Sequence, residues 1–458
     1  MLFFIRIFIA FFTAYFFGRI IFCSFCNPKE KHNIISKIHS YFLGLGFTSI
    51  FFWLFTIATN GYNSSYHIIE ICLVVVIYLY LCVNKKKRLI FLPVVNCSEN
   101  INVCKKKRLF INYLTVILFC FIAVLCCFKS FRYPDGTWDA MSMWNFRAKF
   151  LALGNEEWNR MYFDTFDYSH RDYPLFLPCI IARFFNYIGK FDLIIPLFLS
   201  VFFTLICFVL LYLYLNRLKS KYYSVLSVCI LVYSPHFIFQ GTMQYADIPL
   251  AAFILISLYE FIVWSLRNSK NQPWIGMFFA CLCIWIKNEG IPWFICYSLL
   301  ILYCLYQKEK NLNYFIKNSF RLIIPLLPVF ISVLFVRYFA NSENDLVFGI
   351  IGRLKQLFIL ERYDMIMPFV GKFFQHHYWI LLILVSLLTR FVDKRYEKFK
   401  YLLFMIFFMY LVFIFVYLIT PHDLKWHLDT SFNRITVIYV PSLMFLGCLL
   451  FGLKITHK

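Results

Sequence analysis

Residues 194–215 read IIPLFLSVFFTLICFVLLYLYL and contain no charged side chain. About 20 apolar residues in a helix are enough to cross the hydrocarbon core of a bilayer, so this run predicts a membrane-spanning helix. The composition of the whole chain agrees with that prediction: 62% of its 458 residues are hydrophobic and only 15% are charged. Soluble domains are nearer half apolar, and disordered chains are much less apolar. We therefore predict an all-α polytopic membrane protein.

Similar apolar runs divide the chain into about thirteen predicted transmembrane helices. They fall near residues 2–23, 36–58, 66–83, 110–128, 191–215, 222–239, 248–266, 273–288, 290–306, 321–339, 373–391, 401–420 and 434–453. The longest polar interruption predicts three parts: a four-span segment at 1–128, an external acidic loop with interfacial helices at 129–190, and a transmembrane bundle at 191–458. The bundle has external loops at 340–372 and 421–434.

Basic residues predict the orientation of these spans. The formal charge is +22, and two KKKR runs at 85–88 and 105–108 bracket one loop. Lys and Arg favour cytoplasmic loops, so this loop is expected inside the cell. Alternating from there puts the later basic clusters on the same side and the acidic loop on the other. The charge therefore indicates topology, and we expect no nucleic-acid partner. The predicted location is a bacterial cytoplasmic membrane, with the chemistry on its periplasmic or extracellular face.

The acidic loop opens with the segment YPDGTWDAMSMWNFRAKF at residues 133–150. Its aromatic and apolar residues recur at roughly helical spacing, which is typical of a helix lying in the membrane interface. Asp139 is expected in the first turn of this helix. A carboxylate there either caps free backbone N–H groups or acts at the membrane surface as a general base.

A second interfacial helix is predicted after the segment SHRDYP at residues 169–174. Proline is favoured in the first turn of a helix, so Asp172 precedes a helix start. Asp172 is either a simple N-cap or a functional carboxylate. Two interfacial helices that each begin with an Asp are harder to explain by capping alone.

Two short external turns carry further ionisable residues. Asp247 lies in QYADIPLA at the start of an apolar helix, and Lys287 and Glu289 lie in IKNEGIPWF between two closely spaced spans. A lysine at a span end can extend its ammonium to the interface without any other function. Glu289 can equally be a local partner of Lys287.

The last external segment, TPHDLKWHLDTSFNR at residues 420–434, contains His422, His427 and Arg434. The two histidines are five residues apart, which is a poor helical spacing for zinc. Arg434 lies at the outer end of the last span, against the positive-inside bias. A phosphate at the membrane surface would explain it, because a guanidinium binds phosphate with two parallel hydrogen bonds.

The ordered motifs GTWDA, HRDYP, YADIPLA and KNEG at residues 136–290 resemble those of bacterial GT-C fold glycosyltransferases, the relatives of protein O-mannosyltransferases and aminoarabinose transferases. The resemblance covers about residues 110–300, and the segment HDLKWHLDTS at 422–431 fits similar bacterial membrane proteins. It implies a membrane-embedded transferase that uses a polyprenyl-phosphate-linked sugar as donor. The acceptor stays open among proteins, glycans and lipids.

The resemblance also implies roles for individual residues. Asp139 corresponds to the catalytic carboxylate of the first loop, where it would deprotonate the acceptor hydroxyl in an inverting reaction, and Asp172 is a second catalytic candidate. A divalent cation is an open requirement, with Asp172 and Asp247 as its ligands. The donor phosphate would be bound by the cationic residues Arg171, Lys287, His427 and Arg434. The remaining polar residues expected at the site are His170, Asp247, Glu289 and His422.

This sequence departs from the usual GT-C layout in two respects. Its long acidic loop follows the fourth predicted span, where the family has it after the first, and its first motif lacks a pair of adjacent acids. The main alternative is a transporter or flippase of a lipid-linked sugar. Such proteins place ionisable groups near the middle of the membrane. Most charges here are predicted at span ends on one side, which favours surface chemistry.

Overall fold

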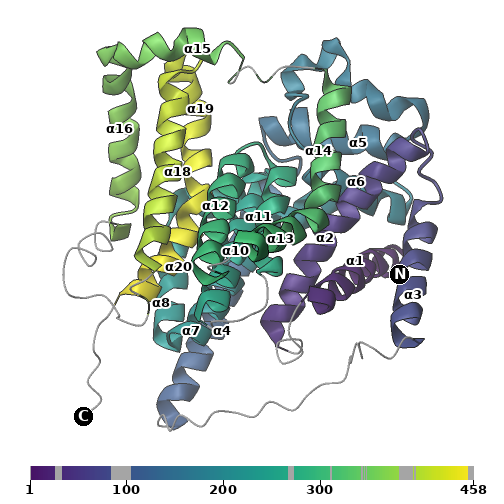
Figure 1. Cartoon of the computed structure of the whole chain (residues 1–458), viewed down its shortest axis with the longest axis horizontal. Helices are drawn as coiled ribbons and strands as arrows, with labels where there is room; N and C mark the ends of the chain where they lie inside the picture. The colour runs from purple at the N-terminus through teal and green to yellow at the C-terminus, as the bar shows by residue number, and fades with distance from the viewer. Residues whose placement is uncertain are drawn as a thin grey trace.

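The computed structural model describes residues 2–25, 33–83, 105–266, 273–309, 312–341, 344, 346, 348–380, 396 and 399–451. Every element that these residues form is a helix, which confirms the predicted all-α class (Figure 1). Eight described helices are long and apolar enough to cross a membrane, or nine if one bent pair counts as a span. The polytopic architecture is therefore confirmed, whereas the count of thirteen is not.

The helices occur in the following order along the chain. The first four are α1 (Leu2–Phe25), α2 (Ile34–Ala58), α3 (Tyr66–Val83) and α4 (Lys105–Arg132). The loop that follows holds η2 (Ala140–Trp144), α5 (Asn145–Leu153), η3 (Asn155–Tyr162), η4 (Asp164–Ser169) and α6 (Phe176–Ile188). The remaining part begins with α7 (Ile194–Leu218), α8 (Lys221–Val232), α9 (Pro235–Thr242), α10 (Asp247–Leu266), α11 (Trp274–Ile286) and α12 (Gly290–Glu309).

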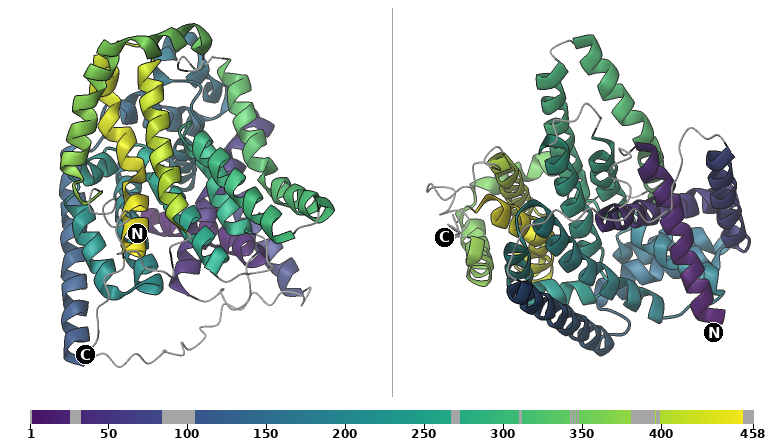
Figure 2. Two further views of the ribbon diagram at one scale, coloured as in Figure 1. Left: turned by 60° about the vertical axis from the view of Figure 1, so that its left-hand side comes forward. Right: turned by 90° about the horizontal axis from the view of Figure 1, so that it is seen from below.

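The chain continues with α13 (Leu312–Ile323), η5 (Ile324–Leu326), α14 (Leu327–Ala340), α15 (Ile350–Arg353), η6 (Leu354–Phe358) and α16 (Leu360–His376). It ends with α18 (Lys400–Leu418), α19 (Leu424–Thr436), η8 (Val437–Tyr439) and α20 (Val440–Leu450). Helices α16, α18 and α19 lie side by side in Figure 1 and in the left view of Figure 2.

Two predicted spans are interrupted, and proline explains both interruptions. The predicted span 222–239 consists of α8 and α9, which meet at an angle of 74°. Pro235 is the first residue of α9, where its missing N–H costs nothing, but it could not continue α8. The predicted span 321–339 is likewise divided by η5, which contains Pro325, before α14 begins. The predicted span 373–391 lies largely outside the described residues, as does the KKKR run at 85–88.

Helix α10 lies at the centre of the bundle. Nearly all of its side chains are buried, and it packs against α7, α11 and α20. A helix that is apolar on all sides is expected to be surrounded by other helices. The central position of α10 fixes its first residue, Asp247, at the end of the bundle where the acidic loop lies.

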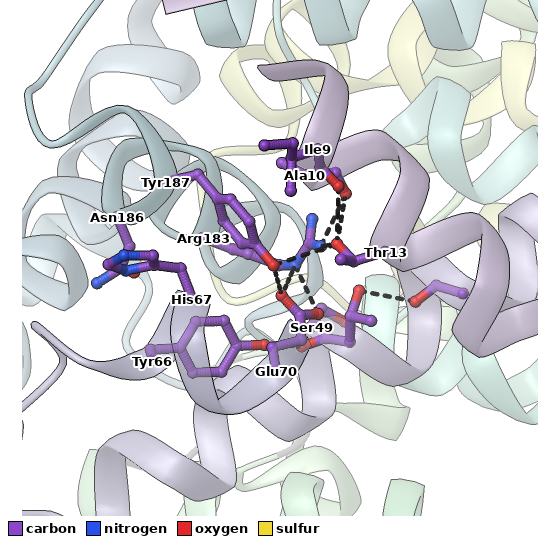
Figure 3. Close-up of polar contacts among 12 residues, drawn as sticks. Ile9, Ala10, Thr13, Ser49, Tyr66, His67, Glu70, Arg183, Asn186 and Tyr187 are labelled. Carbon is purple, nitrogen blue, oxygen red and sulfur yellow. Dashed lines mark hydrogen bonds and ion pairs between the residues drawn. The ribbon is translucent and has the colours of Figure 1, made fainter. Parts of the chain in front are cut away.

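A buried ion pair joins the N-terminal helices to the acidic loop (Figure 3). The guanidinium of Arg183 on α6 donates to the carboxylate of Glu70 on α3 at 3.0 Å, and neither side chain has exposed surface. Arg183 also donates to Thr13 Oγ1 at 2.7 Å and to the carbonyl of Ala10 at 2.8 Å, both on α1. Tyr187 donates to Glu70 at 2.6 Å. Buried charges in a membrane protein persist only when they are paired, so this cluster holds α1, α3 and α6 together.

Candidate active site

A cavity of about 860 Å³ gathers most of the polar residues predicted for the site. It is lined by the predicted residues Asp139, His170, Lys287, Glu289, His422, His427 and Arg434. They come from the acidic loop, the turn between α11 and α12, and the segment that contains α19. All three segments are predicted on one side of the membrane. The structure therefore brings together groups that are separated by up to about three hundred residues in sequence.

Asp139 does not cap the helix that follows it. It directly precedes the π-helical turn η2, and its side chain makes no capping hydrogen bond. Its carboxylate instead accepts a hydrogen bond from Nη1 of Arg434 on α19. The guanidinium of Arg434 also lies over the ring of Tyr245, 5.4 Å from its centroid. The carboxylate predicted as the base and a cation predicted to bind phosphate thus form an ion pair with each other.

The turn that carries Asp139 is held against the connection between α9 and α10. Gly136 has a positive φ of 77°, and a Cβ at this position would lie 2.8 Å from the carbonyl oxygen of Met243. Only glycine allows both the conformation and this close approach. Asn145 Nδ2 donates to Gln244 Oε1 at 2.7 Å, and Thr137 is hydrogen-bonded to the hydroxyl of Tyr245. These contacts fix Asp139 at the wall of the cavity.

Lys287 lies between two carboxylates. Its Nζ is 2.8 Å from both Asp247 Oδ1 and Glu289 Oε1, and only 2% of its side chain is exposed. The prediction that it merely extends to the interface is therefore not what the structure shows. Asp247 does not line the cavity, whereas Lys287 and Glu289 do. The charge of this ammonium is already balanced within its own cluster.

Asp172 organises one wall of the cavity without lining it. It is buried, and its Oδ2 accepts hydrogen bonds from Asn288 Nδ2 at 2.8 Å, Asn344 Nδ2 at 2.6 Å and Arg337 Nη1 at 3.3 Å. Arg337 Nη2 also donates to Asn288 Oδ1 at 3.0 Å. All three donors line the cavity. Helix α6 begins after Leu175, so Asp172 is not its N-cap.

Arg147 holds the turn that contains His170 and Asp172. Its guanidinium has no exposed surface and donates to the carbonyls of Tyr173 at 2.9 Å, Ser169 at 2.8 Å and His170. His170 has a φ of 47°, in the left-handed region that non-glycine residues rarely adopt. The buried guanidinium of Arg147 donates to three carbonyls of this turn and so stabilises the conformation of His170. The sequence contains no sharper signal than two cations, Arg147 and Lys149, in a largely apolar interfacial helix.

Tyr173 faces the same acidic surroundings. Burial, followed by the charges of Glu289 and Asp172, raises the pKa of the Tyr173 phenol well above its ordinary value. The phenol therefore stays protonated, and its hydroxyl lies within 3.5 Å of Glu289 Oε1, to which it donates. Tyr173 thus adds a neutral donor to the cavity wall.

The structure puts Arg337, and not the predicted Arg171, at the cavity. Arg171, predicted to bind phosphate, donates to the carbonyl of Tyr162 at 2.8 Å and to Asp164 at 2.7 Å, and it does not line the cavity. Arg337, which was not predicted, does line it. Arg337 lies near the end of an apolar helix, where an arginine that extends to the interface is the ordinary interpretation.

Part of the cavity lining is apolar. It is formed mainly by α18 and the residue after it, through Val412, Phe413, Phe415, Val416, Tyr417 and Ile419. Trp138 and Trp426 also line the cavity and remain more than half exposed. A cavity with one charged wall and one apolar wall suits a ligand that has a charged headgroup and a hydrocarbon tail.

The two predicted metal ligands do not fit a shared divalent cation. The Oδ2 of Asp172 is surrounded by amide and guanidinium donors, and Asp247 is paired with the ammonium of Lys287. Across the part of the chain that the structure describes, no three His, Cys, Asp or Glu side chains are grouped so that they could hold a metal. Divalent cations prefer several oxygen ligands, so we derive no step through a metal.

Comparison with known proteins supports the predicted resemblance. Residues 182–333 match the family model of dolichyl-phosphate-mannose-protein mannosyltransferase, which is about a third of the chain. This segment includes Asp247, Lys287 and Glu289, and the resemblance to membrane glycosyltransferases is confirmed over it. No curated protein and no solved structure matches the chain significantly. The fold and this match together indicate a polytopic membrane protein similar to the GT-C glycosyltransferases.

Proposed function

We propose that this protein is an integral membrane glycosyltransferase that moves a sugar from a polyprenyl-phosphate donor to an acceptor hydroxyl. One observation carries the proposal: a single cavity joins the carboxylate of Asp139, the guanidinium groups of Arg434 and Arg337, and an apolar wall from α18. These are the groups that a lipid-linked sugar phosphate requires. The family match to a mannosyltransferase model supports the same reaction class.

The donor is held by its two chemically different ends. The isoprenoid units next to the phosphate lie along the apolar wall, where burial of hydrocarbon supplies binding energy. Arg434 and Arg337 bind the phosphate, because a guanidinium matches phosphate oxygens bidentately. Lys287 contributes less, since Asp247 and Glu289 already balance its charge.

Transfer then needs no cofactor to activate the sugar, because the bond to phosphate is already activated. Asp139 takes the proton of the acceptor hydroxyl as the new bond to the anomeric carbon forms. The bond from that carbon to the phosphate oxygen breaks, and attack from the opposite side inverts the anomeric centre. The departing polyprenyl phosphate gains negative charge, which the two guanidinium groups stabilise.

We place this reaction on the periplasmic or extracellular face of a bacterial cytoplasmic membrane. The predicted topology puts the lining segments on the side opposite the Lys-rich loop at 85–108, which supports that placement. The acceptor stays open among proteins, glycans and lipids. The exposed edges of Trp138 and Trp426 beside the cavity leave room for a polar acceptor.

The experiment that tests the function measures polyprenyl-phosphate release by the purified protein in lipid nanodiscs. A panel of polyprenyl-phosphate sugars is offered to wild type, Asp139→Asn and the matched control Asp164→Asn. Asp164 lies in the same loop with its side chain 99% exposed. We expect Asp139→Asn to lower turnover about 100-fold or more while donor still binds. The control should stay within about twofold.

Two results would contradict the proposal. One is a donor that binds but is never consumed with a broad set of acceptors. The other is an Asp139→Asn variant that turns over as fast as wild type. The first result would favour the alternative of a transporter or flippase, and movement of labelled donor across sealed vesicles would then be the measurement to make. The second result would leave the reaction in place and overturn Asp139 as its base.

A further inference from the structure

The pairing of Asp139 with Arg434 has consequences for how the site works, and these rest on the proposed function. The reaction requires Asp139 as a base and Arg434 as a phosphate ligand, yet in the structure each is the other's partner. We propose that the donor phosphate competes with Asp139 for Arg434, so that the base is released only when donor is bound. Donor would therefore bind before acceptor.

Arg434 is the cation in the cavity best placed for such an exchange. Lys287 is held by two carboxylates, and Arg337 is held by Asp172 and Asn288. Arg434 has one carboxylate partner in the described part of the chain, and that partner, Asp139, itself lines the cavity.

A second observation concerns the other side of the same guanidinium. Nε of Arg434 is buried and has no hydrogen-bond partner among the described residues. Buried polar groups are normally hydrogen-bonded, and an exception calls for an explanation. A phosphate oxygen at Nε would satisfy this donor and share the positive charge that now holds Asp139. Two anions on one guanidinium repel each other, so a bound phosphate weakens the ion pair between Arg434 and Asp139.

The exchange couples the availability of the Asp139 carboxylate to donor occupancy. Without donor, Oδ2 of Asp139 is engaged by Arg434. With donor bound, that oxygen is free to accept the acceptor's proton as the glycosidic bond forms and the sugar–phosphate bond breaks. Protonated Asp139 is neutral and no longer competes, so Arg434 keeps the polyprenyl phosphate. When Asp139 loses its proton to solvent, it forms the ion pair with Arg434 again, which favours release of the polyprenyl phosphate.

A double-mutant cycle on product binding isolates this competition. The dissociation constant of polyprenyl phosphate is measured in nanodiscs for wild type, Asp139→Asn, Arg434→Gln and the double variant, with Asp164→Asn as a control. We expect Asp139→Asn to tighten binding about tenfold in the wild-type background, because contacting groups couple this strongly. In the Arg434→Gln background the gain should fall to about twofold or less.

The cycle separates the competition from simple repulsion. Repulsion between Asp139 and phosphate predicts the same gain in both backgrounds, and that result would overturn the inference. Failure of wild type to bind polyprenyl phosphate at all would instead overturn the proposed function. Arg434→Lys replaces Arg434→Gln if the latter does not fold. Lysine keeps the charge but lacks the paired donors, so the gain should then lie between the two values.

Discussion

Glu70 and Arg183 form an ion pair in which neither side chain has any exposed surface, with Arg183 Nε 3.0 Å from the carboxylate (Figure 3). The pair links α3 to α6, and the further bonds of Arg183 reach α1. Helix α6 follows directly after the turn that contains Asp172 and Tyr173. The N-terminal helices α1 and α3 therefore support α6 and, through it, the turn that forms one wall of the cavity.

Breaking this pair should destabilise the protein strongly. Glu70→Gln leaves a buried guanidinium without its counter-charge, which costs about 3–5 kcal/mol. We expect a clearly lower Tm in detergent, measured by the temperature dependence of near-ultraviolet circular dichroism. The double variant Glu70→Leu with Arg183→Met removes both charges and should recover much of the loss. A Glu70→Gln variant that melts with wild type would show that the pair contributes little.

Substitution of Asp172 should affect donor binding more than the chemical step. Its carboxylate holds Asn288, Asn344 and Arg337 in the cavity wall but does not line the cavity itself. We expect Asp172→Asn to raise the KM for donor about tenfold and to lower kcat less, because the loss is one of positioning. Steady-state kinetics on the released polyprenyl phosphate provide the measurement. A collapse of kcat equal to that of Asp139→Asn would place Asp172 in the chemical step instead.

Arg337, which lines the cavity, and Arg171, which does not, allow a paired test. Arg337→Gln should raise the KM for donor about tenfold or more, because it removes a guanidinium from the cavity wall. Arg337→Lys should recover part of the loss, since it keeps the charge without the fork of donors. Arg171→Gln should change the KM less than about twofold, because Arg171 is bound to Tyr162 and Asp164 away from the cavity. The reverse order of effects would restore the assignment made from the sequence.

Tyr173 should remain neutral through the range in which an ordinary tyrosine ionises. Its pKa is raised by burial and then by Glu289 and Asp172, so the folded protein favours the protonated phenol. The folded state's preference for the protonated phenol stabilises the protein fully below about pH 10, the ordinary pKa of tyrosine. This stabilisation is lost as the pH rises through the higher pKa of the folded state. We expect the pH dependence of stability near pH 10 to differ between wild type and Tyr173→Phe. Chemical denaturation across pH 8–11 measures this, and identical profiles would contradict it.

Removal of divalent cations should leave donor turnover within about twofold of the untreated protein. The carboxylates of Asp172 and Asp247 are already engaged by amide, guanidinium and ammonium donors, and metal sites need free oxygen ligands. Turnover after chelation and gel filtration is the measurement. Loss of activity that Mg²⁺ or Mn²⁺ restores would show that a cation is required and that the carboxylates rearrange to hold it.

Much of the architecture could be predicted because hydropathy is a local property. Each apolar run long enough to cross a bilayer can be recognised in the sequence without knowing which helices pack against it. Helices α7 and α10 correspond closely to such runs. Counting spans and basic loops predicted that Asp139, Lys287 and Arg434 lie on one side of the membrane, and all three line the same cavity. The break between α8 and α9 was missed, because an apolar run with one proline has the same hydropathy whether straight or bent.

Composition and the order of the apolar helices were determined by the sequence alone, because each depends on residues close together in the chain. The partner of each ionisable residue was decided only by the tertiary structure. Asp139 and Arg434 are 295 residues apart, and Arg337 lies 165 residues from Asp172. Such contacts depend on how the helices pack across the bundle. A side chain that could cap a helix, extend to the interface or bind phosphate acquires one of these roles only when packing brings its partner within hydrogen-bonding distance.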